Sequence, residues 1–175
     1  FRGIGLFVNR VEHLNTHGGS VRIYVERRGN PDSSLEKFLT NEMKAGLDSF
    51  SYYEKFSNEI YAIRRNFRRN IDSLKNEFKK IAGYGAPAKA TTALNYFGIT
   101  NDDIEYIIED NELKHDKYVP GIGIPIKSKD HCLSSMPDLV IVMAWNFFDS
   151  IVEQNTELTG NGVKFLKISD LYADS

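Results

Sequence analysis

The chain has 175 residues, of which 41% are hydrophobic and 26% charged, and its formal net charge is −2. These values are typical of one globular domain with at most a small appendage, and they exclude a disordered tail, a collagen-like repeat and a coiled-coil rod. The near-neutral charge does not favour nucleic-acid binding, and no apolar run is long enough for a membrane span.

The single cysteine, Cys132, excludes an intrachain disulfide framework and a cysteine-based zinc site. It fits a protein of the reducing cytoplasm. The four histidines lack a ligand-like spacing, so we expect no metal site in this chain. The sequence starts at Phe1 rather than Met, inside a predicted strand, and we therefore expect a fragment of a longer protein.

Two β-rich runs open the chain, at residues 4–11 and 20–26. In the second run every other residue is apolar, which is the pattern of a half-buried strand. Glycines between the runs allow a turn, so we predict an antiparallel strand pair. His17, directly before these glycines, is the histidine that we expect to contact a ligand.

A long helix is predicted over residues 49–80. Apolar residues recur there at steps of three and four, and no Pro or Gly lies between Asp48 and Ile81. The opposite face carries Arg and Lys side chains, at Arg64, Arg65, Arg68, Arg69, Lys75, Lys79 and Lys80. We interpret this basic face as a solvated side of the helix or as a surface for an anionic ligand or partner. The helix is also a candidate surface for a homodimer.

From residue 79 onward, short strands alternate with helices. The predicted strands cover 79–82, 104–108, 124–127, 139–144 and 163–168, and the predicted helices cover 88–97, 130–134 and 147–158. This alternation predicts an α/β fold with a three-layer parallel sheet. The long helix and the N-terminal antiparallel strand pair precede that sheet.

The turn Gly83-Tyr84-Gly85-Ala86 joins the first of these strands to the helix at 88–97. A Gly-x-Gly turn before a helix is typical of a phosphate site, because backbone N–H groups and the helix N-terminus face the anion. Lys89 lies in the first helical turn, and Asp110 follows the second strand, where such folds place a ribose-binding acid. The full dinucleotide fingerprint is not met, so a purely structural turn is the alternative.

Two further segments follow the carboxyl ends of predicted strands, where ligands bind in open α/β sheets. The loop over 109–123 is long for a compact domain, and we expect its Lys114 to help neutralise a diphosphate. Trp145 and Asn146 follow the central strand, and we expect them to stack on and hydrogen-bond a base or sugar. The alternatives are a solvated loop and ordinary packing of the tryptophan.

Four segments, in chain order, resemble one family. GYGAPAKATTALNYFGI at 83–99 resembles a signature of the carboxyl-terminal domain of sugar C-methyltransferases, which use S-adenosylmethionine to methylate a carbon of nucleotide-linked keto-deoxysugars. Residues 17–25, 104–126 and 137–147 resemble the family's H-G-G-S-x-R-x-x-V strand, D-x-x-P-x-K-x-G-x-x-x-P-G loop with its flanking strands, and P-D-x-x-x-x-x-A-W-N segment. The resemblance implies a Rossmann-like domain.

The chain departs from the complete family enzyme in several ways. It has no cysteine-rich zinc segment, no D/E-x-G-x-G loop of the methyl-donor domain and no Y-H-E-H segment with the proposed base. Glu12-His13 resembles that base pair only superficially, so no catalytic residue is assigned. In the long loop, Glu112 stands where the family has Pro and Asp116 where it tends to have Gly.

The resemblance implies a division of the chain into three segments. We expect residues 1–28 to be the terminal strand pair of a truncated methyl-donor domain, 29–80 a linker and the long helix, and 81–175 the Rossmann-like domain. The sites for S-adenosylmethionine and zinc would then belong to the full-length enzyme and lie outside this chain. The isolated chain is expected to be inactive and cytoplasmic.

The function that the resemblance implies is binding of a nucleotide-diphosphate sugar, with neither nucleic acid nor membrane as a partner. The expected contacts are His17, Gly83, Tyr84, Gly85, Ala86, Lys89, Asp110, Lys114, Trp145 and Asn146. Two alternatives stay open. One is a non-catalytic nucleotide-binding or regulatory module on the same fold, and the other is an NAD-type dehydrogenase in which Asp110 holds a ribose.

Overall fold

The structure, a computed structural model, describes residues 1–16 and 19–173 of the chain. Its contacts divide the chain into two compact units, Phe1–Glu59 and Ile60–Ser175, and each unit is described by itself. Within the described ranges, no helix is both long enough and apolar enough to cross a membrane.

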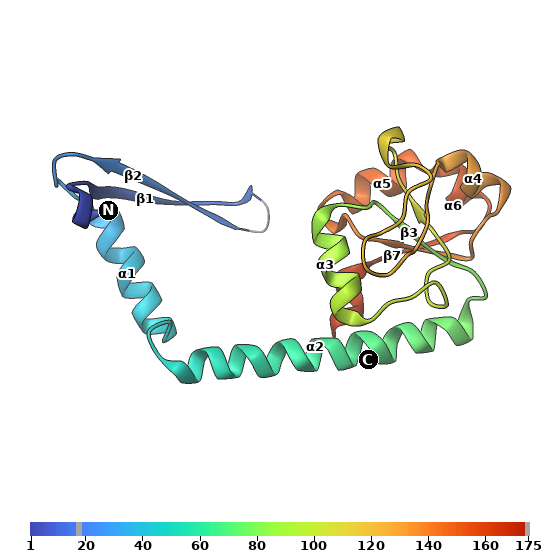
Figure 1. The fold of residues 1–175 in the computed structure, drawn as a ribbon, viewed down its shortest axis with the longest axis horizontal. Helices are drawn as coiled ribbons and strands as arrows, with labels where there is room; N and C mark the ends of the chain where they lie inside the picture. The colour runs from blue at the N-terminus through green and yellow to red at the C-terminus, as the bar shows by residue number, and fades with distance from the viewer. Residues whose placement is uncertain (17–18, 174–175) are drawn as a thin grey trace. The chain divides into compact units, whose positions relative to one another are not determined.

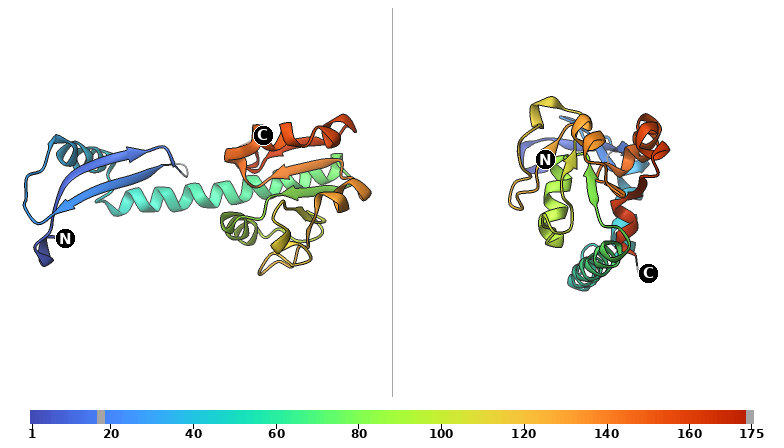
Figure 2. Two further views of the ribbon diagram at one scale, coloured as in Figure 1. Left: turned by 90° about the horizontal axis from the view of Figure 1, so that it is seen from above. Right: turned by 90° about the vertical axis from the view of Figure 1, so that its right-hand side faces the viewer.

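The first unit contains an antiparallel hairpin (Figure 2). β1 (Phe7–Leu14) pairs with β2 (Ser20–Glu26), which confirms the strand pair predicted from the sequence. β1 begins at residue 7 rather than residue 4, because a 3₁₀ turn, η1 (Arg2–Ile4), precedes it. That turn ends at Gly5 with a φ of 72°, a left-handed conformation that glycine adopts at little cost.

α1 (Ser33–Ala45) is a helix that the sequence analysis does not predict. It begins after Asp32, whose side chain accepts a hydrogen bond of 2.8 Å from the Ser34 N–H, and it ends at Gly46 with a φ of 79°. Asp at an N-cap and Gly after a last turn are ordinary helix-boundary signals. The sequence analysis treats this stretch as a linker because a polar segment follows the strand pair, and it overlooks these two signals.

α2 (Phe50–Glu77) is a single helix of 28 residues. Along its apolar stripe, Phe67 and Ile71 are buried, whereas Tyr53 and Phe56 are 52% and 54% exposed. The stripe therefore contributes to a hydrophobic core only in the half of the helix that belongs to the second unit.

The second unit is built on a five-stranded parallel sheet with the strand order β5-β4-β3-β6-β7. The strands are β3 (Ile81–Tyr84), β4 (Ile107–Ile108), β5 (Ile126–Lys127), β6 (Leu139–Val142) and β7 (Lys164–Lys167). The α/β class and the parallel sheet predicted from the sequence are confirmed. Four strands are shorter than expected, and β3 lies two residues beyond the predicted 79–82, so that Gly83 and Tyr84 belong to the strand rather than to the turn. Counted from β3, the order is 3-2-1-4-5, so the chain reverses direction across the sheet between β3 and β6.

Helices cover both faces of this sheet (Figure 1). On one face, α2 and α3 (Ala88–Phe97) meet through Phe67 and Phe97, whose stacked rings have centroids 4.0 Å apart. The other face is covered by α4 (Lys129–Ser134), α5 (Phe148–Gln154) and α6 (Thr156–Gly160). All four residues of β6 are buried, as its continuous apolar run predicts for a strand covered on both sides.

The helix expected over 147–158 is divided in the structure. A 3₁₀ turn, η4 (Trp145–Phe147), leads into α5, and Asn155 separates α5 from α6. The backbone of Asn155 has a φ of −117° and a ψ of 40°, and its buried side chain donates 2.7 Å to the Ile151 carbonyl. A side-chain bond to the preceding turn competes with regular helix geometry, which accounts for the break.

Asp103 anchors α2 to the loop that precedes β4. Its carboxylate is 3% exposed and accepts hydrogen bonds from Arg68 at 2.6 and 2.8 Å, from Lys75 at 2.8 Å and from the Thr100 N–H at 3.0 Å. Burial raises the pKa of Asp103, but the bonds from Arg68 and Lys75 outweigh it and hold the pKa far below its ordinary value. The folded protein therefore keeps this carboxylate charged.

We expect Asp103→Asn to lower the free energy of unfolding by about 3 kcal/mol, because an amide leaves two cations of α2 without their buried counter-charge. Urea denaturation at pH 7 measures this loss. Asp102→Asn, at the exposed neighbouring position, is the matched control and should change stability by less than about 0.5 kcal/mol.

The Asp103 pKa is lower in the folded state than in the unfolded state, so its contribution is complete above about pH 4 and declines as the pH falls below that value. The difference in free energy of unfolding between wild type and Asp103→Asn should therefore become smaller at acidic pH. Equal stabilities of the two Asn variants at pH 7 would contradict the anchoring role.

Candidate functional site

A hollow of about 350 Å³ lies at the carboxyl edge of the sheet. It is formed by the ends of β3, β4 and β6 together with α5. Its lining residues are Tyr84, Gly85, Ala86, Pro87, Glu109, Asp110, Lys114, Ala144, Phe147, Ser150, Ile151 and Gln154. The hollow is at the point where the strand order reverses, which is the position that ligands occupy in open α/β sheets.

Tyr84, at the end of β3, connects two strands of the site. Its side chain is buried, and its hydroxyl donates a hydrogen bond of 2.8 Å to Asp110 at the end of β4. Burial, with further contributions from Asp110 and Glu109, raises the pKa of Tyr84 to about 12. The phenol is therefore protonated at neutral pH and acts as a hydrogen-bond donor within the site.

Asn155 lies beside the Tyr84 hydroxyl and adds a second buried polar group. Its amide nitrogen donates to Ile151, but its carbonyl oxygen Oδ1 has no hydrogen-bond partner among the described residues. A buried acceptor without a partner is uncommon in folded proteins. This part of the second unit therefore retains an unused hydrogen-bond acceptor.

Glu109 binds the glycine turn. Its carboxylate accepts 2.8 Å from the Ala86 N–H, 3.0 Å from Lys114 Nζ and 3.1 Å from the Asn111 N–H. The side chain is 12% exposed. Burial raises the pKa of Glu109, but these three donors outweigh burial, and the pKa lies below its ordinary value.

Three backbone N–H groups of the glycine turn donate to protein oxygens. The N–H of Gly83 donates 2.9 Å to the Tyr106 carbonyl, that of Gly85 donates 2.8 Å to the Ile108 carbonyl, and that of Ala86 donates to Glu109. Gly85 has a φ of 85°, so this position favours glycine for its backbone conformation. In this structure the turn offers a ligand its side chains and carbonyls rather than these three donors.

The structure brings together five of the residues predicted from the sequence, namely Tyr84, Gly85, Ala86, Asp110 and Lys114. The other predicted residues of the second unit are Gly83, Lys89, Trp145 and Asn146, and they do not line the hollow. His17 lies outside the described residues. The ligand contacts of all ten residues stay predictions.

Gly83 and Lys89 have contacts that explain their positions. Gly83 lies inside β3, where a Cβ atom would come within 3.0 Å of Ile107 and 3.1 Å of Met143. Lys89, in the first turn of α3, places its ammonium 3.8 Å from the centroid of the Trp145 ring. A cation in this position is attracted by the ring face, so the pair links α3 to the segment after β6.

Two lysines of the loop after β4 donate hydrogen bonds to groups of the protein. Lys114 donates 3.1 Å to the Ala86 carbonyl as well as to Glu109, and Lys117 donates to the Leu113 carbonyl. Asp116 has a φ of 57°, a conformation in which Asp is tolerated better than most residues. This backbone conformation explains why a Gly suits the position and why Asp is an acceptable replacement.

Glu109, Phe147 and Gln154 also line the hollow, and the sequence analysis misses them. Glu109 directly precedes Asp110, so the pair of acids at a strand end is the signal that would have included it. Phe147 is exposed in η4 and Gln154 ends α5, and no sequence pattern distinguishes them from ordinary surface residues.

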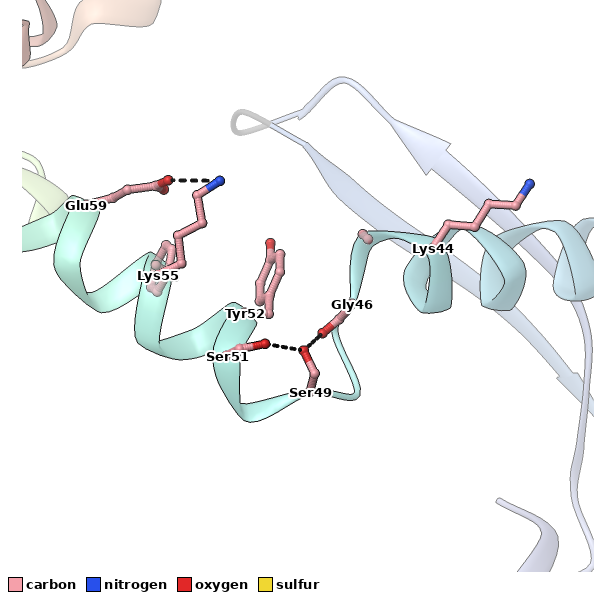
Figure 3. Close-up of a pocket in the computed structure, with 9 residues that line it drawn as sticks. Lys44, Gly46, Ser49, Ser51, Tyr52, Lys55 and Glu59 are labelled. Carbon is pink, nitrogen blue, oxygen red and sulfur yellow. Dashed lines mark hydrogen bonds and ion pairs between the residues drawn. The ribbon is translucent and has the colours of Figure 1, made fainter.

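A second hollow, of about 570 Å³, lies at the corner between α1 and α2 in the first unit (Figure 3). Its polar side chains bond to one another. Ser49 bonds with the Gly46 carbonyl and with Ser51, and Lys55 forms an ion pair with Glu59 at 3.8 Å. The ion pair is exposed and contributes little to stability. None of the residues predicted to bind ligand lies here.

The basic face of α2 lines a third hollow, of about 680 Å³, in the second unit. Its lining residues are Tyr61, Arg64, Arg65, Arg68, Arg69 and Asp72. Arg68 is bound to Asp103 and Asp72, and the Arg64 guanidinium lies 5.3 Å from the centroid of the Tyr96 ring. Two of the four arginines are therefore used in packing α2 against its own unit.

No group of three or more His, Cys, Asp or Glu residues within residues 1–16 and 19–173 is arranged to hold a metal ion. The chemistry that the described site offers is hydrogen bonding and charge. The carboxyl edge provides two carboxylates, an ammonium, a phenol and amides next to an exposed aromatic ring.

A family model described as the C-methyltransferase C-terminal domain matches residues 15–168. The chain belongs to this family. C-methyltransferase NovU of Streptomyces niveus is similar to it, with 27% identity over 169 residues. The alignment covers 95% of this chain and 40% of NovU, so the chain spans less than half the length of that relative. The family resemblance inferred from the sequence is confirmed.

For this C-methyltransferase C-terminal domain, we expect Lys114→Met to raise the pKa of Glu109 towards its ordinary value, because a hydrogen-bonded cation is lost. The free energy of unfolding at pH 7 should fall by about 1 kcal/mol. Carbonyl NMR titration of the Glu side chains measures the pKa.

Lys117→Met is the matched control, since Lys117 donates to a backbone carbonyl and not to Glu109. Because the Glu109 pKa is lowered by folding, the stability difference between Lys114→Met and wild type should shrink as the pH falls below about 4. A Glu109 pKa that is the same in both Met variants would rule out the ion pair.

Proposed function

We propose that this chain is the Rossmann-like, substrate-binding domain of a sugar C-methyltransferase that uses S-adenosylmethionine. The hollow at the carboxyl edge of β3, β4 and β6 would receive the nucleotide-diphosphate sugar. The observation that carries this proposal is the position of the hollow: it lies at the reversal of strand order, and five of the predicted binding residues line it. Membership in the C-methyltransferase family gives the reaction class.

Methylation at carbon requires that the carbon first lose a proton. In the complete enzyme a base would remove the proton next to the keto group of the sugar, because an unactivated C–H bond is not a nucleophile. The carbon would then accept the methyl group as the sulfur–methyl bond breaks, and S-adenosylhomocysteine would be the leaving group. S-adenosylmethionine supplies the electrophilic methyl group. We assign this chain the task of binding and orienting the sugar nucleotide, and we assign it no catalytic base.

The residues of this chain do not fit the methyl donor. The turn after β3 reads GYGAPA rather than the acidic glycine loop of the resembled family, and the Gly85 and Ala86 N–H groups donate within the protein. We therefore propose that S-adenosylmethionine, and the zinc implied by the resemblance, are bound outside this chain. A cytoplasmic location remains part of this proposal.

We also propose that residues 1–28 complete a methyl-donor domain, that 29–80 form the linker and long helix, and that 81–175 form the Rossmann-like domain. Among the described residues of the first unit, only Asn9 and Val11 are buried. A two-stranded hairpin without a core is marginally stable alone. Its exposed apolar side chains would be covered by the remainder of that domain, and a homodimer through α2 is the alternative.

Hydrogen exchange on the 175-residue chain tests this division. Backbone amides of β1 and β2 should exchange roughly 100-fold faster than those of β3 and β6, because the hairpin can open without disrupting a hydrophobic core. Equal protection of hairpin and sheet would contradict the proposal. A homodimer would protect the amides of the hairpin or of α2 from exchange only at high protein concentration. Sedimentation at several concentrations measures whether the chain forms such a dimer.

Titration with a deoxythymidine-diphosphate sugar tests the proposed function. We expect micromolar binding to the 175-residue chain by calorimetry, and Asp110→Asn should weaken it about tenfold by replacing a charged acceptor with a neutral one. Asp102→Asn is the matched control and should bind as wild type does. The Asn side chain can still accept the hydrogen bond from the Tyr84 hydroxyl, so the fold should be preserved. A loss of affinity in this variant would then reflect ligand binding rather than unfolding.

Two results would oppose this function. Adenosine diphosphate binding as tightly as the sugar nucleotide would favour the non-catalytic nucleotide-binding module. Methyl transfer from S-adenosylmethionine by the chain alone would contradict the placement of the donor site outside it.

A further inference from the structure

The start of α3 has the local architecture of a phosphate site. A strand ends in a Gly-x-Gly turn, and a helix of ten residues follows directly. The N-cap residue of this helix is Pro87, and its side chain accepts no hydrogen bond from the first N–H groups of the helix. In such turns the backbone N–H groups and the positive end of the helix dipole attract an anion.

The protein places an anion of its own there. The Glu109 carboxylate accepts the Ala86 N–H, which belongs to the turn, and the same oxygen, Oε2, also accepts from Lys114 Nζ. Lys114 also donates to the Ala86 carbonyl, so the carboxylate, the ammonium and the turn form one closed cluster. A carboxylate and a phosphate oxygen accept the same kind of hydrogen bond. Glu109 thus takes the Ala86 N–H, which a phosphate in the turn would otherwise accept from, while the Gly83 and Gly85 N–H groups donate to carbonyls near β4.

The charge around the hollow also disfavours a phosphate. Glu109 and Asp110 are two carboxylates, and Lys114 is the one ammonium among the lining residues. Since Lys114 is already paired with Glu109, a diphosphate entering the hollow would meet Asp110 without a compensating cation. Like charges at close range repel each other, although the exposure of Asp110 to solvent weakens this repulsion.

The remaining lining groups suit an uncharged ligand that carries hydrogen-bond donors. Asp110 has one carboxylate oxygen bonded to the Tyr84 hydroxyl and a second carboxylate oxygen that can accept from a ligand donor. Gln154 and Ser150 add an amide and a hydroxyl, and Phe147, 66% exposed, presents an apolar ring. Pockets for small molecules combine such apolar walls with a few placed polar groups.

We infer that Glu109 is a specificity-determining residue that fills the phosphate position, so that the hollow accepts a neutral, hydroxyl-bearing ring of the ligand and excludes its phosphates. This inference rests on the proposed function, because the ring would be either the sugar or the nucleoside of the sugar nucleotide. The diphosphate would then lie outside the hollow.

Pyrophosphate binding to the 175-residue chain tests the inference directly. In wild type, millimolar pyrophosphate should leave the NMR amide signals of Gly85 and Ala86 unchanged. In Glu109→Ala, the Ala86 N–H and Lys114 lose their shared partner, and pyrophosphate should bind at least about tenfold more tightly and shift these signals, which corresponds to about 1.4 kcal/mol. Glu109→Gln, which keeps an acceptor for the Ala86 N–H, should show a smaller gain.

Glu112→Ala is the matched control, because it removes an exposed carboxylate from the same loop without opening the turn. It should bind pyrophosphate as weakly as wild type. An equal gain in pyrophosphate affinity in Glu112→Ala would mean that the effect comes from the general surface charge, and it would overturn the inference. Binding of pyrophosphate to the wild-type turn, with shifts at Gly85 and Ala86, would also overturn it.

Thymidine and a free deoxyhexose distinguish which ring enters the hollow. The ring that occupies it should shift the Asp110 and Gln154 signals, and Asp110→Asn should reduce that shift. Failure of the sugar nucleotide to bind would defeat the proposed function and leave the pyrophosphate result standing. Phosphate binding at the wild-type turn, together with tight sugar-nucleotide binding, would defeat only the inference about Glu109.

Discussion

The buried carboxylate of Asp103 determines how α2 is seated against the sheet. The aromatic contact between Phe67 and Phe97 attracts the two helices without fixing their relative position along the helix axis, since dispersion and burial have little directional preference. Asp103 adds direction, because it receives donors from two positions of α2 and one from the preceding turn. Once α2 is seated, one face of β3 is closed, and the end of that strand has a defined place beside β4 and β6. The site at the carboxyl edge therefore depends on a contact that lies outside it.

The parts of the fold that were predictable from the sequence are those in which local pattern and final environment agree. The alternation in 20–26 predicted the strand correctly, although Val21 and Ile23 are exposed and β2 is not half-buried as expected. The end of α3 was predicted correctly because a glycine in the left-handed region, here Gly98, is a direct signal of a helix end. α1 was missed although its ends carry boundary signals and its apolar residues Leu35, Phe38, Leu39 and Met43 recur at helical spacing, because the polar segment before it indicated a linker. The division at Asn155 was missed because a buried polar residue reads, in sequence, like any residue on the solvated face of a helix.

The site was predictable only as far as topology determines it. Tyr84 and Asp110 follow parallel strands that turned out to be neighbours, so their proximity followed from the strand pattern. The Glu109–Lys114 pair depends on the path of an irregular loop, which no periodicity describes. That pair changes how the glycine turn is interpreted, because Glu109 accepts the Ala86 N–H while the Gly83 and Gly85 N–H groups donate to the Tyr106 and Ile108 carbonyls. Sequence motifs report which groups are available, whereas the folded structure shows which of them remain unpaired.

The closed cluster of Glu109, Lys114 and the glycine turn also affects how the domain responds to salt. A binding site built from unpaired cations attracts a cloud of counterions, and its affinity for an anion falls as ionic strength rises. In this protein the opposite charges compensate each other at contact distance, 3.0 Å apart, with the carboxylate largely shielded from water. Capture of a neutral ring would displace few ions. The contribution of the ring to binding would then change little with ionic strength, whereas the contribution of a diphosphate outside the hollow would depend on it.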